Sequence, residues 1–510
     1  MKSNKLSRTE NTKRNIVASL VMLIIQMIFQ FLSRTVIVHY LGSDYLGLSS
    51  LFASILSVLS MAELGFSTAI TYNLYKPLAN NDIDAVCALL AYYQKIYRTV
   101  GTIILCAGAA VIPFLQFIIK GELPADINMY LLYILYLINT GTSYFLFAHK
   151  TALLTAIQRM DLTKIVTMIV YLVQYCLQIA ALILFRNYYL YIVWMIVGSA
   201  LINVANGYVS KKKCPQYECR GMVSVETKKD VMTRVKGLLI CKISGVTYTS
   251  LDSIIISAFI GLSAVAIYNN YITIFNAVCS VLTLVRSAMQ ASVGNSVASE
   301  SVEKNYKDLC LWQFLFSIIA TWCTSCMLCL FQPFMSIWMG ENMLLPINVV
   351  VIICAWFMVS IVQHPYYLYL SGNGLWNEMK WSYIFSTVFN LIMNIVLGKY
   401  FGVLGIVLAS FLANLICGTF WQCMIIFKQY FRRSSKSYFI RQGIYFAVAV
   451  GICFVSYEIC GLISISGWKG LILKAGVCML VTSVLLILIY AKTESFQQAV
   501  RFTKRVLKRG

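Results

Sequence analysis

Charged side chains are scarce in this sequence of 510 residues. They make up 12% of it, about half of the roughly 25% that soluble domains carry, which argues against a water-soluble enzyme. Proline is scarce as well, with 7 residues, and this excludes a proline-rich or disordered scaffold. The chain has three histidines, His39, His149 and His364, so it offers few groups for acid–base catalysis.

Hydrophobic residues dominate instead. They make up 60% of the chain, and the mean hydropathy is +0.76. A membrane-spanning helix needs about 20 consecutive apolar residues. Fourteen runs of this kind lie near 15–39, 45–74, 96–119, 127–149, 162–185, 188–209, 237–260, 264–294, 308–335, 344–370, 380–399, 403–427, 438–461 and 467–491. The sequence predicts an all-α polytopic membrane protein with about 14 transmembrane helices, the first retained rather than cleaved as a signal peptide.

The basic residues predict the orientation of these helices. The chain has 41 Lys and Arg against 19 Asp and Glu, a formal net charge of +22. With the N-terminus inside, 34 of the 41 fall on the inner side and five on the outer side. This asymmetry predicts that both termini are cytoplasmic. The basic residues separate hydrophobic runs and form no basic domain, so anionic membrane lipids, not nucleic acid, are the expected partners.

The 17 cysteines form no recognisable framework. Most lie within apolar runs, where cysteine behaves as a small hydrophobic residue. Cys214 and Cys219 lie in a lysine-rich loop without a nearby histidine, a spacing that does not indicate zinc. We therefore expect no metal site, no cofactor and no disulfide framework.

An internal repeat organises the predicted helices. The segment 46–50 aligns with 265–269 at an offset of 219, and 113–115 matches 333–335 at 220. Two parallel six-helix repeats are typical of transporters that work by alternating access. The predicted regions are an N-terminal half (1–210), a basic cytoplasmic linker (211–236), a C-terminal half (237–430), two additional transmembrane helices (431–491) and a basic amphipathic tail (492–510). We expect the tail to lie on the inner leaflet.

Charge within a span is costly and usually functional, and four charged residues in the predicted spans stand out. Arg34 and Asp252 lie toward the outer ends of their spans, and Glu63 and Arg286 lie in the inner halves. Arg34 and Arg286 are candidates for substrate binding in a cavity, and Glu63 and Asp252 for gating or ion coupling. Arg34 could pair with Asp252 and Glu63 with Arg286; alternatively, each is satisfied within its own half.

Signals for catalysis are weak. Asp82 and Asp84 form a D-x-D, a metal motif of many glycosyltransferases, but they precede a predicted helix, where acidic residues favour the helix dipole. His364 precedes Pro365 within a predicted span, where a buried structural histidine is the simpler interpretation. The short outer loops leave no room for a catalytic domain. A membrane-embedded glycosyl or acyl transferase is therefore the weaker alternative, and we expect no catalytic residue.

The segments 62–66 (AELGF) and 72–79 (YNLYKPLA) resemble the second span and following loop of bacterial polysaccharide flippases. These are the Wzx-like O-antigen and teichoic-acid exporters of the MATE-related multidrug/oligosaccharidyl-lipid/polysaccharide superfamily. The resemblance implies MATE-like V-shaped halves and flipping of an undecaprenyl-diphosphate-linked oligosaccharide for lipopolysaccharide, capsule or teichoic acid. It also implies a monomer in the bacterial cytoplasmic membrane, with polysaccharide polymerase machinery as a further partner.

Members of that family often carry cationic residues in a central cavity, which agrees with Arg34 and Arg286. Asp252 departs from a purely cationic cavity. A cation-coupled multidrug exporter of the same superfamily, with Glu63 or Asp252 as the ion site, remains an alternative.

Overall fold

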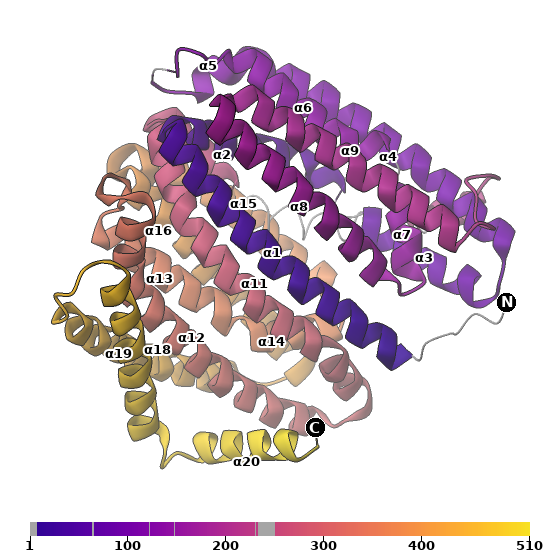
Figure 1. The fold of residues 1–510 in the computed structure, drawn as a ribbon. Coiled ribbons are helices and arrows are strands. Elements are labelled where there is room, and N and C mark those ends of the chain that lie inside the picture. Colours follow the sequence, from indigo (N-terminus) through magenta and orange to yellow (C-terminus); the bar gives the residue numbers. More distant parts are fainter. Residues whose placement is uncertain are drawn as a thin grey trace. The chain divides into compact units, whose positions relative to one another are not determined.

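The computed structural model describes residues 8–63, 66–121, 123–146, 148–229, 231–232 and 250–509. Every regular element among these residues is a helix (Figure 1), since a helix satisfies its backbone polar groups internally, as lipid requires. The chain divides into two compact units, Met1–Ala266 and Ile267–Gly510. We describe each unit separately.

The first unit begins with the long helix α1 and ends, among the labelled helices, with α9. Its elements are α1 (Arg8–Tyr40), α2 (Ser43–Leu59), η1 (Ser60–Glu63), α3 (Phe66–Ala79), α4 (Ile83–Val111), η2 (Ile112–Phe114), α5 (Leu115–Ile118), α6 (Met129–Phe145), α7 (Ala148–Ala156), α8 (Met160–Phe185) and α9 (Tyr188–Lys213). Asp82 caps α4, because its carboxylate accepts a hydrogen bond from the Ala85 backbone N–H at 2.9 Å. This contact agrees with the helix-start interpretation of the D-x-D.

The second unit contains most of α11 and all later helices. Its elements are α11 (Leu262–Ser299), α12 (Val302–Met339), η3 (Glu341–Met343), α13 (Ile347–Val362), α14 (His364–Gly372), α15 (Trp376–Phe401), α16 (Val403–Ala413), η4 (Asn414–Trp421), α17 (Gln422–Ile426), η5 (Phe427–Phe431), α18 (Lys436–Gly461), α19 (Gly467–Tyr490) and α20 (Glu494–Arg509). The elements from α16 to η5 form one continuous span with π-helical turns.

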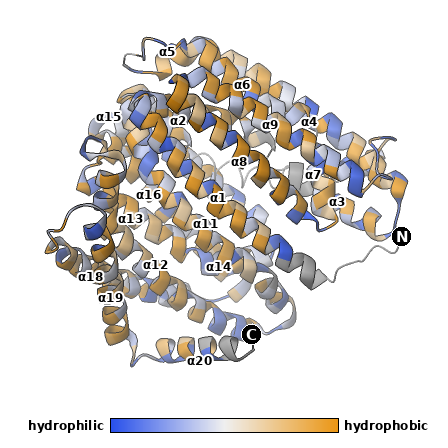
Figure 2. Cartoon of the chain, in the orientation of Figure 1, coloured by the Kyte–Doolittle hydropathy of each residue, from blue (hydrophilic) through white to orange (hydrophobic). Residues whose placement is uncertain are grey.

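Among the described residues, 11 helices are long and apolar enough to cross a membrane, or up to 12 if the bent pair α6 and α7 counts as one span. Hydrophobic residues follow these helices along most of their length (Figure 2). The second predicted run, 45–74, is divided among α2, η1 and α3. Much of the seventh, 237–260, lies outside the described residues. The protein is thus a multi-pass membrane protein, and these numbers are compatible with 14 spans.

Helix boundaries confirm the internal repeat. The first residues of α2 and α11 differ by 219 positions, as do those of α4 and α12. Asp82 and Ser301 cap α4 and α12, again 219 positions apart. The pair α6 and α7 bends by 49°, and α13 and α14 meet at the corresponding place, around Gln363. The two repeats differ at one place: the α2–α3 segment of the first is interrupted at η1, whereas the corresponding helix of the second, α11, is continuous.

The described part of the predicted linker packs against the first unit. Cys214 is buried in a cluster with side chains of α3, α4 and α7, and Tyr217 and Cys219 pack on that cluster. Lys150 Nζ on α7 donates a hydrogen bond to the Tyr217 carbonyl at 3.4 Å. Burial raises the pKa of the Cys214 and Cys219 thiols. The beginning of the linker is therefore part of the folded unit.

The C-terminal tail forms α20, as its amphipathic pattern predicts. Phe496 and Ala499 pack on a cluster that includes Phe314 of α12 and Tyr490 of α19. The Phe502 ring contacts the Trp312 ring edge to face, with centroids 5.1 Å apart. These apolar side chains contact protein, and the position of the tail on the inner leaflet stays a prediction.

Candidate functional site

Arg34 lies on α1 within the span Val17–Tyr40. Its Nη2 donates a hydrogen bond to Ser50 Oγ of α2 at 3.4 Å. Its guanidinium also interacts electrostatically with Tyr188 and Tyr191 of α9. Arg34 is half-buried, so polar protein groups replace part of the water that its charge would lose inside a membrane. The first unit therefore holds its intramembrane cation among hydroxyl groups.

A chain of buried hydroxyls continues from this arginine. Tyr136 of α6 donates to Ser49 Oγ at 2.9 Å, and its hydroxyl lies 2.9 Å from that of Tyr188. The rings of Tyr188 and Tyr191 stack with centroids 5.5 Å apart. Buried hydroxyls are tolerated when they are hydrogen-bonded. Four helices, α1, α2, α6 and α9, thus meet at one polar site, which we call the Arg34 site.

Two glutamines of α8 extend this polar region. Gln174 Nε2 donates to Gln178 Oε1 at 3.2 Å, and Gln178 Nε2 donates to the Tyr191 carbonyl at 3.2 Å. Gly198 of α9 lies so close that a Cβ there would be 1.9 Å from Gln174 Oε1. A larger residue at position 198 would therefore displace the Gln174 side chain from its hydrogen bond with Gln178.

Arg286 lies on α11 within the span Leu262–Ser299. Its guanidinium carbon is 4.5 Å from the centroid of the Tyr367 ring on α14. One helical turn later, Gln290 Nε2 donates to the Leu368 carbonyl at 3.4 Å. One turn further, Gly294 lies against Gly372. This side of α11 therefore packs along α14, and the arginine lies over an aromatic face. We call this the Arg286 site.

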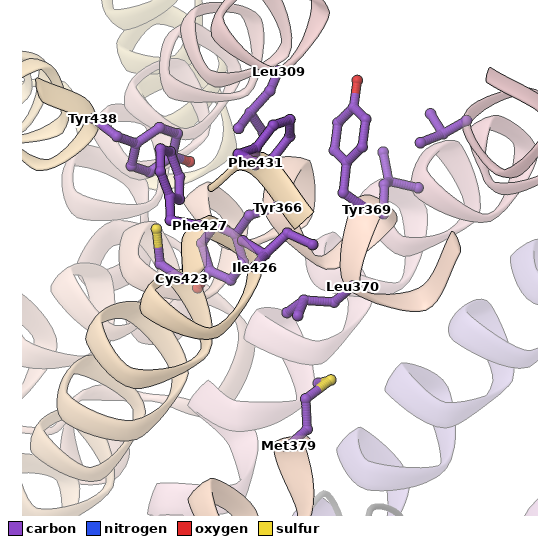
Figure 3. Packing of buried hydrophobic residues seen from close by; sticks show 12 residues of the cluster. Leu309, Tyr366, Tyr369, Leu370, Met379, Cys423, Ile426, Phe427, Phe431 and Tyr438 are labelled. Atoms are coloured by element: carbon purple, nitrogen blue, oxygen red, sulfur yellow. The ribbon is translucent and has the colours of Figure 1, made fainter. Parts of the chain in front are cut away.

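Aromatic packing holds α14 in place. Tyr366 and Tyr369 are buried in a cluster with Phe427, Phe431 and Tyr438 (Figure 3). The Tyr366 hydroxyl donates to the Gly418 carbonyl at 2.7 Å. Because close-packed side chains resist displacement, the neighbouring Tyr367 has a fixed backbone from which to present its ring to Arg286.

Among the described residues, the Arg286 guanidinium contacts an aromatic ring rather than a hydrogen-bond acceptor. Within the part of the chain that the structure describes, Arg286 makes no hydrogen bond and no ion pair, and its side chain is half-buried. A guanidinium that stacks through its face directs its five N–H groups outward in its own plane. These donors match two oxygens of a phosphate. Arg286 can therefore bind an anion without losing its aromatic contact.

The structure describes the side chain of one acidic candidate, Asp252, but not that of the other, Glu63. Asp252 is fully buried in the short helix Ser250–Phe259, next to the fully buried Ser253. Glu63 ends η1, and its side chain lies outside the described residues. The suggested pairs, Arg34 with Asp252 and Glu63 with Arg286, therefore stay predictions.

A charged cluster that was not predicted from the sequence lies at the start of α8. Asp161 is buried, and its carboxylate pairs with Arg14 Nη2 at 3.0 Å and Arg159 Nε at 2.9 Å. The adjacent groove between α1 and α8, about 420 Å³, is lined by apolar side chains together with Arg14, Asp161 and Lys164. Asp161 could not be selected from the sequence, because acidic residues are ordinary in a first helical turn. The tyrosines near Arg34 could not be selected either, because the chain has 32 tyrosines.

The chain was compared with known families and structures. A family model described as polysaccharide biosynthesis protein matches residues 12–290. The lipid II flippase MurJ, in an inward closed conformation, is similar with a TM-score of 0.64 and 13% identity, covering 94% of this chain and 98% of that one. An inward-facing multidrug resistance MATE family transporter of the MOP superfamily is similar with a TM-score of 0.61 and 14% identity. The match covers 80% of this chain and 98% of that one.

A mutant form of the Vibrio cholerae MATE transporter VcmN is also similar, with a TM-score of 0.58 and 11% identity, covering 84% of this chain and 98% of that one. No curated protein matches the chain. At these identities the likeness shows the fold alone, and that fold is the one shared by MATE transporters and MurJ.

Proposed function

Because this chain belongs to the polysaccharide biosynthesis protein family, we propose that it flips an undecaprenyl-diphosphate-linked oligosaccharide from the inner to the outer leaflet of a bacterial cytoplasmic membrane. The glycan serves a surface polysaccharide such as O-antigen, capsule or teichoic acid. Transport proceeds by alternating access of two halves, 1–210 and 237–430, with both termini cytoplasmic. The fold, shared with MATE transporters and a lipid II flippase, supports a transporter rather than an enzyme.

The observation that carries this proposal is Arg286. A permanently charged, half-buried guanidinium lies within a membrane-spanning helix, with its carbon 4.5 Å from the centroid of the Tyr367 ring. Charge at such a depth is costly and usually marks a functional site. A diphosphate supplies the oxygens that the in-plane N–H donors require. We assign Arg286 to the diphosphate of the lipid-linked substrate.

The cost of moving a polar substrate across a membrane explains the roles that we propose for the other three charged residues. A glycan and a diphosphate lose their water in hydrocarbon, at a cost of several kcal/mol for each unpaired polar group. Hydroxyl-rich protein surface can replace that water, and the Arg34 site offers it through Tyr136 and Tyr188. We assign Arg34 to a second contact with the anionic substrate, and Glu63 and Asp252 to gating. The lipid tail stays in the membrane.

A leaflet-specific assay tests the function. Bacteria that lack their own polysaccharide flippase display no surface glycan, and expression of this chain is expected to restore it. Arg286→Ala is expected to abolish this rescue at normal membrane abundance. Failure across a panel of hosts with different glycans, with the protein abundant in each membrane, would contradict the proposal.

A second candidate is a cation-coupled multidrug exporter of the same superfamily. It is favoured by the full burial of Asp252, since a buried carboxylate is a suitable site for a coupling cation. Drug-resistance measurements in cells without their own exporters separate the two: an exporter confers resistance that Asp252→Asn removes, whereas a flippase confers none. A membrane-embedded transferase would instead transfer sugar or acyl groups as purified protein.

A further inference from the structure

Three helices of the second unit bring cysteine side chains together. Cys329 of α12, Cys460 of α18 and Cys478 of α19 have their Sγ atoms all within 4.8 Å of one another. A fourth thiol, Cys326 of α12, has its Sγ 4.0 Å from that of Cys478. The first three are buried, with exposed fractions of 4%, 3% and 0%. We call these four residues the thiol cluster.

The surroundings of the cluster suit thiolates better than an apolar core would. Ser325 Oγ lies 3.6 Å from Cys478 Sγ, and Thr482 Oγ1 lies 3.9 Å from it. Ser456 Oγ is 3.1 Å from Thr482 Oγ1. Hydroxyls that donate to a metal-bound sulfur orient the ligand and stabilise its charge. Packing of small hydrophobic residues requires no hydroxyl groups beside a sulfur.

We propose that the thiol cluster binds one soft d¹⁰ metal ion, Cu(I) or Zn(II). Thiolate ligands select these ions. Sulfurs bonded at about 2.3 Å to one ion lie roughly 3.8–4.0 Å apart in tetrahedral or trigonal geometry. The Sγ separations among Cys329, Cys460 and Cys478, all within 4.8 Å, exceed that range by less than about 1 Å, a change within reach of small side-chain rotations. Three sulfurs suit Cu(I). For Zn(II), a rotation that brings Cys326, now 4.0 Å from Cys478, toward Cys329 and Cys460 would complete four.

An ion can reach this cluster through an adjoining cavity. A cavity of about 460 Å³ is lined by both Cys329 and Cys460, and also by Lys474 and Gln332. Bound to three or four thiolates, a d¹⁰ ion carries net negative charge, which Lys474 at the same cavity partly offsets. A dry site in the centre of the helix bundle would lack both features.

The metal would connect distinct parts of the chain. Cys326 and Cys329 belong to the repeated core, whereas Cys460 and Cys478 belong to the two additional helices α18 and α19. A shared ion would attach these helices to α12 and stabilise the second unit by its binding free energy. This role is independent of flipping, so its test does not depend on the proposed function.

The test uses the purified full chain in detergent, reduced and free of oxygen. Cu(I) and Zn(II) are added in separate samples, competed with a chromophoric chelator, and counted per chain after desalting. We expect one tightly bound equivalent of one of the two ions. Cys329→Ser and Cys478→Ser should each weaken binding at least about tenfold, since even outer partners of a ligand have that effect. The matched control, Cys106→Ser with Cys176→Ser, removes two exposed thiols and should change nothing.

A second measurement covers variants that fail to fold. In the wild-type protein, the bound ion should protect Cys329, Cys460 and Cys478 from alkylation, read by peptide mass spectrometry, and should leave Cys106 reactive. Equal alkylation of the cluster with and without either ion, at a denaturant concentration that exposes the metal-free cluster to the reagent, would overturn the proposal. Binding by the wild-type protein no tighter than by Cys478→Ser would also overturn it.

Discussion

Arg34 and Arg286 both lie within membrane-spanning helices, and tyrosine surrounds each of them in a different way. At the Arg34 site the hydroxyl groups matter, since Tyr136 and Tyr188 form a hydrogen-bonded chain next to the guanidinium. At the Arg286 site the ring matters, since Tyr367 lies under the guanidinium face. Arg34 donates one of its N–H groups to a protein side chain. Arg286 makes no hydrogen bond within the described residues, so its N–H groups can bind a ligand.

This difference indicates a division of roles. A guanidinium already hydrogen-bonded by its own unit supports the packing of α1 against α2. A guanidinium that lies over a ring and makes no hydrogen bond within the described residues is preorganised and still able to bind an anion. We therefore expect substitutions at Arg286 to affect transport first, and substitutions around Arg34 to affect stability as well.

The largest effect is expected for Arg286→Ala. Loss of two charge-assisted hydrogen bonds to a phosphate, about 1.5–3 kcal/mol each, should reduce export at least about a hundredfold, while membrane abundance stays near normal. Arg286→Lys should keep partial activity, because lysine retains the charge but not the two-donor geometry. Surface glycan per cell, normalised to membrane protein, measures this.

Arg98 provides the matched control, because it is an exposed arginine of α4 that the proposal leaves out of the site. Arg98→Ala should export normally. Full export by Arg286→Ala would remove Arg286 from the mechanism and with it the proposed division of roles.

A charge exchange tests whether Arg34 has an acidic partner in gating. If Arg34 and Asp252 close the outer side, Arg34→Asp and Asp252→Arg should each lose most export, because an uncompensated buried charge costs about 3–5 kcal/mol. The double variant should recover a clear fraction of it. Export and abundance are measured together for all three variants. A double variant no better than either single one, at equal abundance, argues that the two residues act separately.

Tyrosine-to-phenylalanine variants sharpen the comparison directly. Tyr188→Phe removes a hydroxyl from the Arg34 site and should lower stability by about 1 kcal/mol, read as a lower Tm. Tyr367→Phe keeps the ring under Arg286 and should export normally. Tyr367→Leu removes the cation–π contact, about 0.5–2 kcal/mol, and should reduce export a few-fold. Equal effects of Phe and Leu at position 367 would show that the ring face is not what holds Arg286.

Much of the fold could be predicted from the sequence because lipid allows few solutions. Apolar runs must become helices, and the 219-residue offset reappears in the starts of α2 and α11. Boundaries were less predictable. The helix α4 begins at Ile83 rather than near residue 96, because Asp82 caps a polar first turn that a hydropathy pattern does not register.

The sites were less predictable than the helices. Arg34 and Arg286 could be selected as rare intramembrane charges, but their neighbours depend on which helices pack together. Tyr367 is 81 positions from Arg286 in sequence, and nothing local distinguishes it from other tyrosines. The same holds for the thiol cluster: Cys329 and Cys460 lie 131 positions apart, and the expectation of no metal site rested on spacing alone.

The smallest effect on transport is expected from the C-terminal helix, which belongs to neither arginine site. Truncation after Lys492 removes α20, whose Phe496 and Phe502 pack on side chains of α12. Aromatic pairs of this kind contribute about 0.5–1.5 kcal/mol beyond their buried area, and the basic face adds attraction to anionic lipid, about 1 kcal/mol per residue near the surface. The truncated protein should therefore show a lower Tm and lower membrane abundance, while export per folded molecule stays within about twofold of wild type. Phe502→Ala, which removes only the contact with Trp312, should reproduce a small part of the loss in Tm. An abundant, correctly oriented but inactive truncated protein would instead place α20 in the transport mechanism.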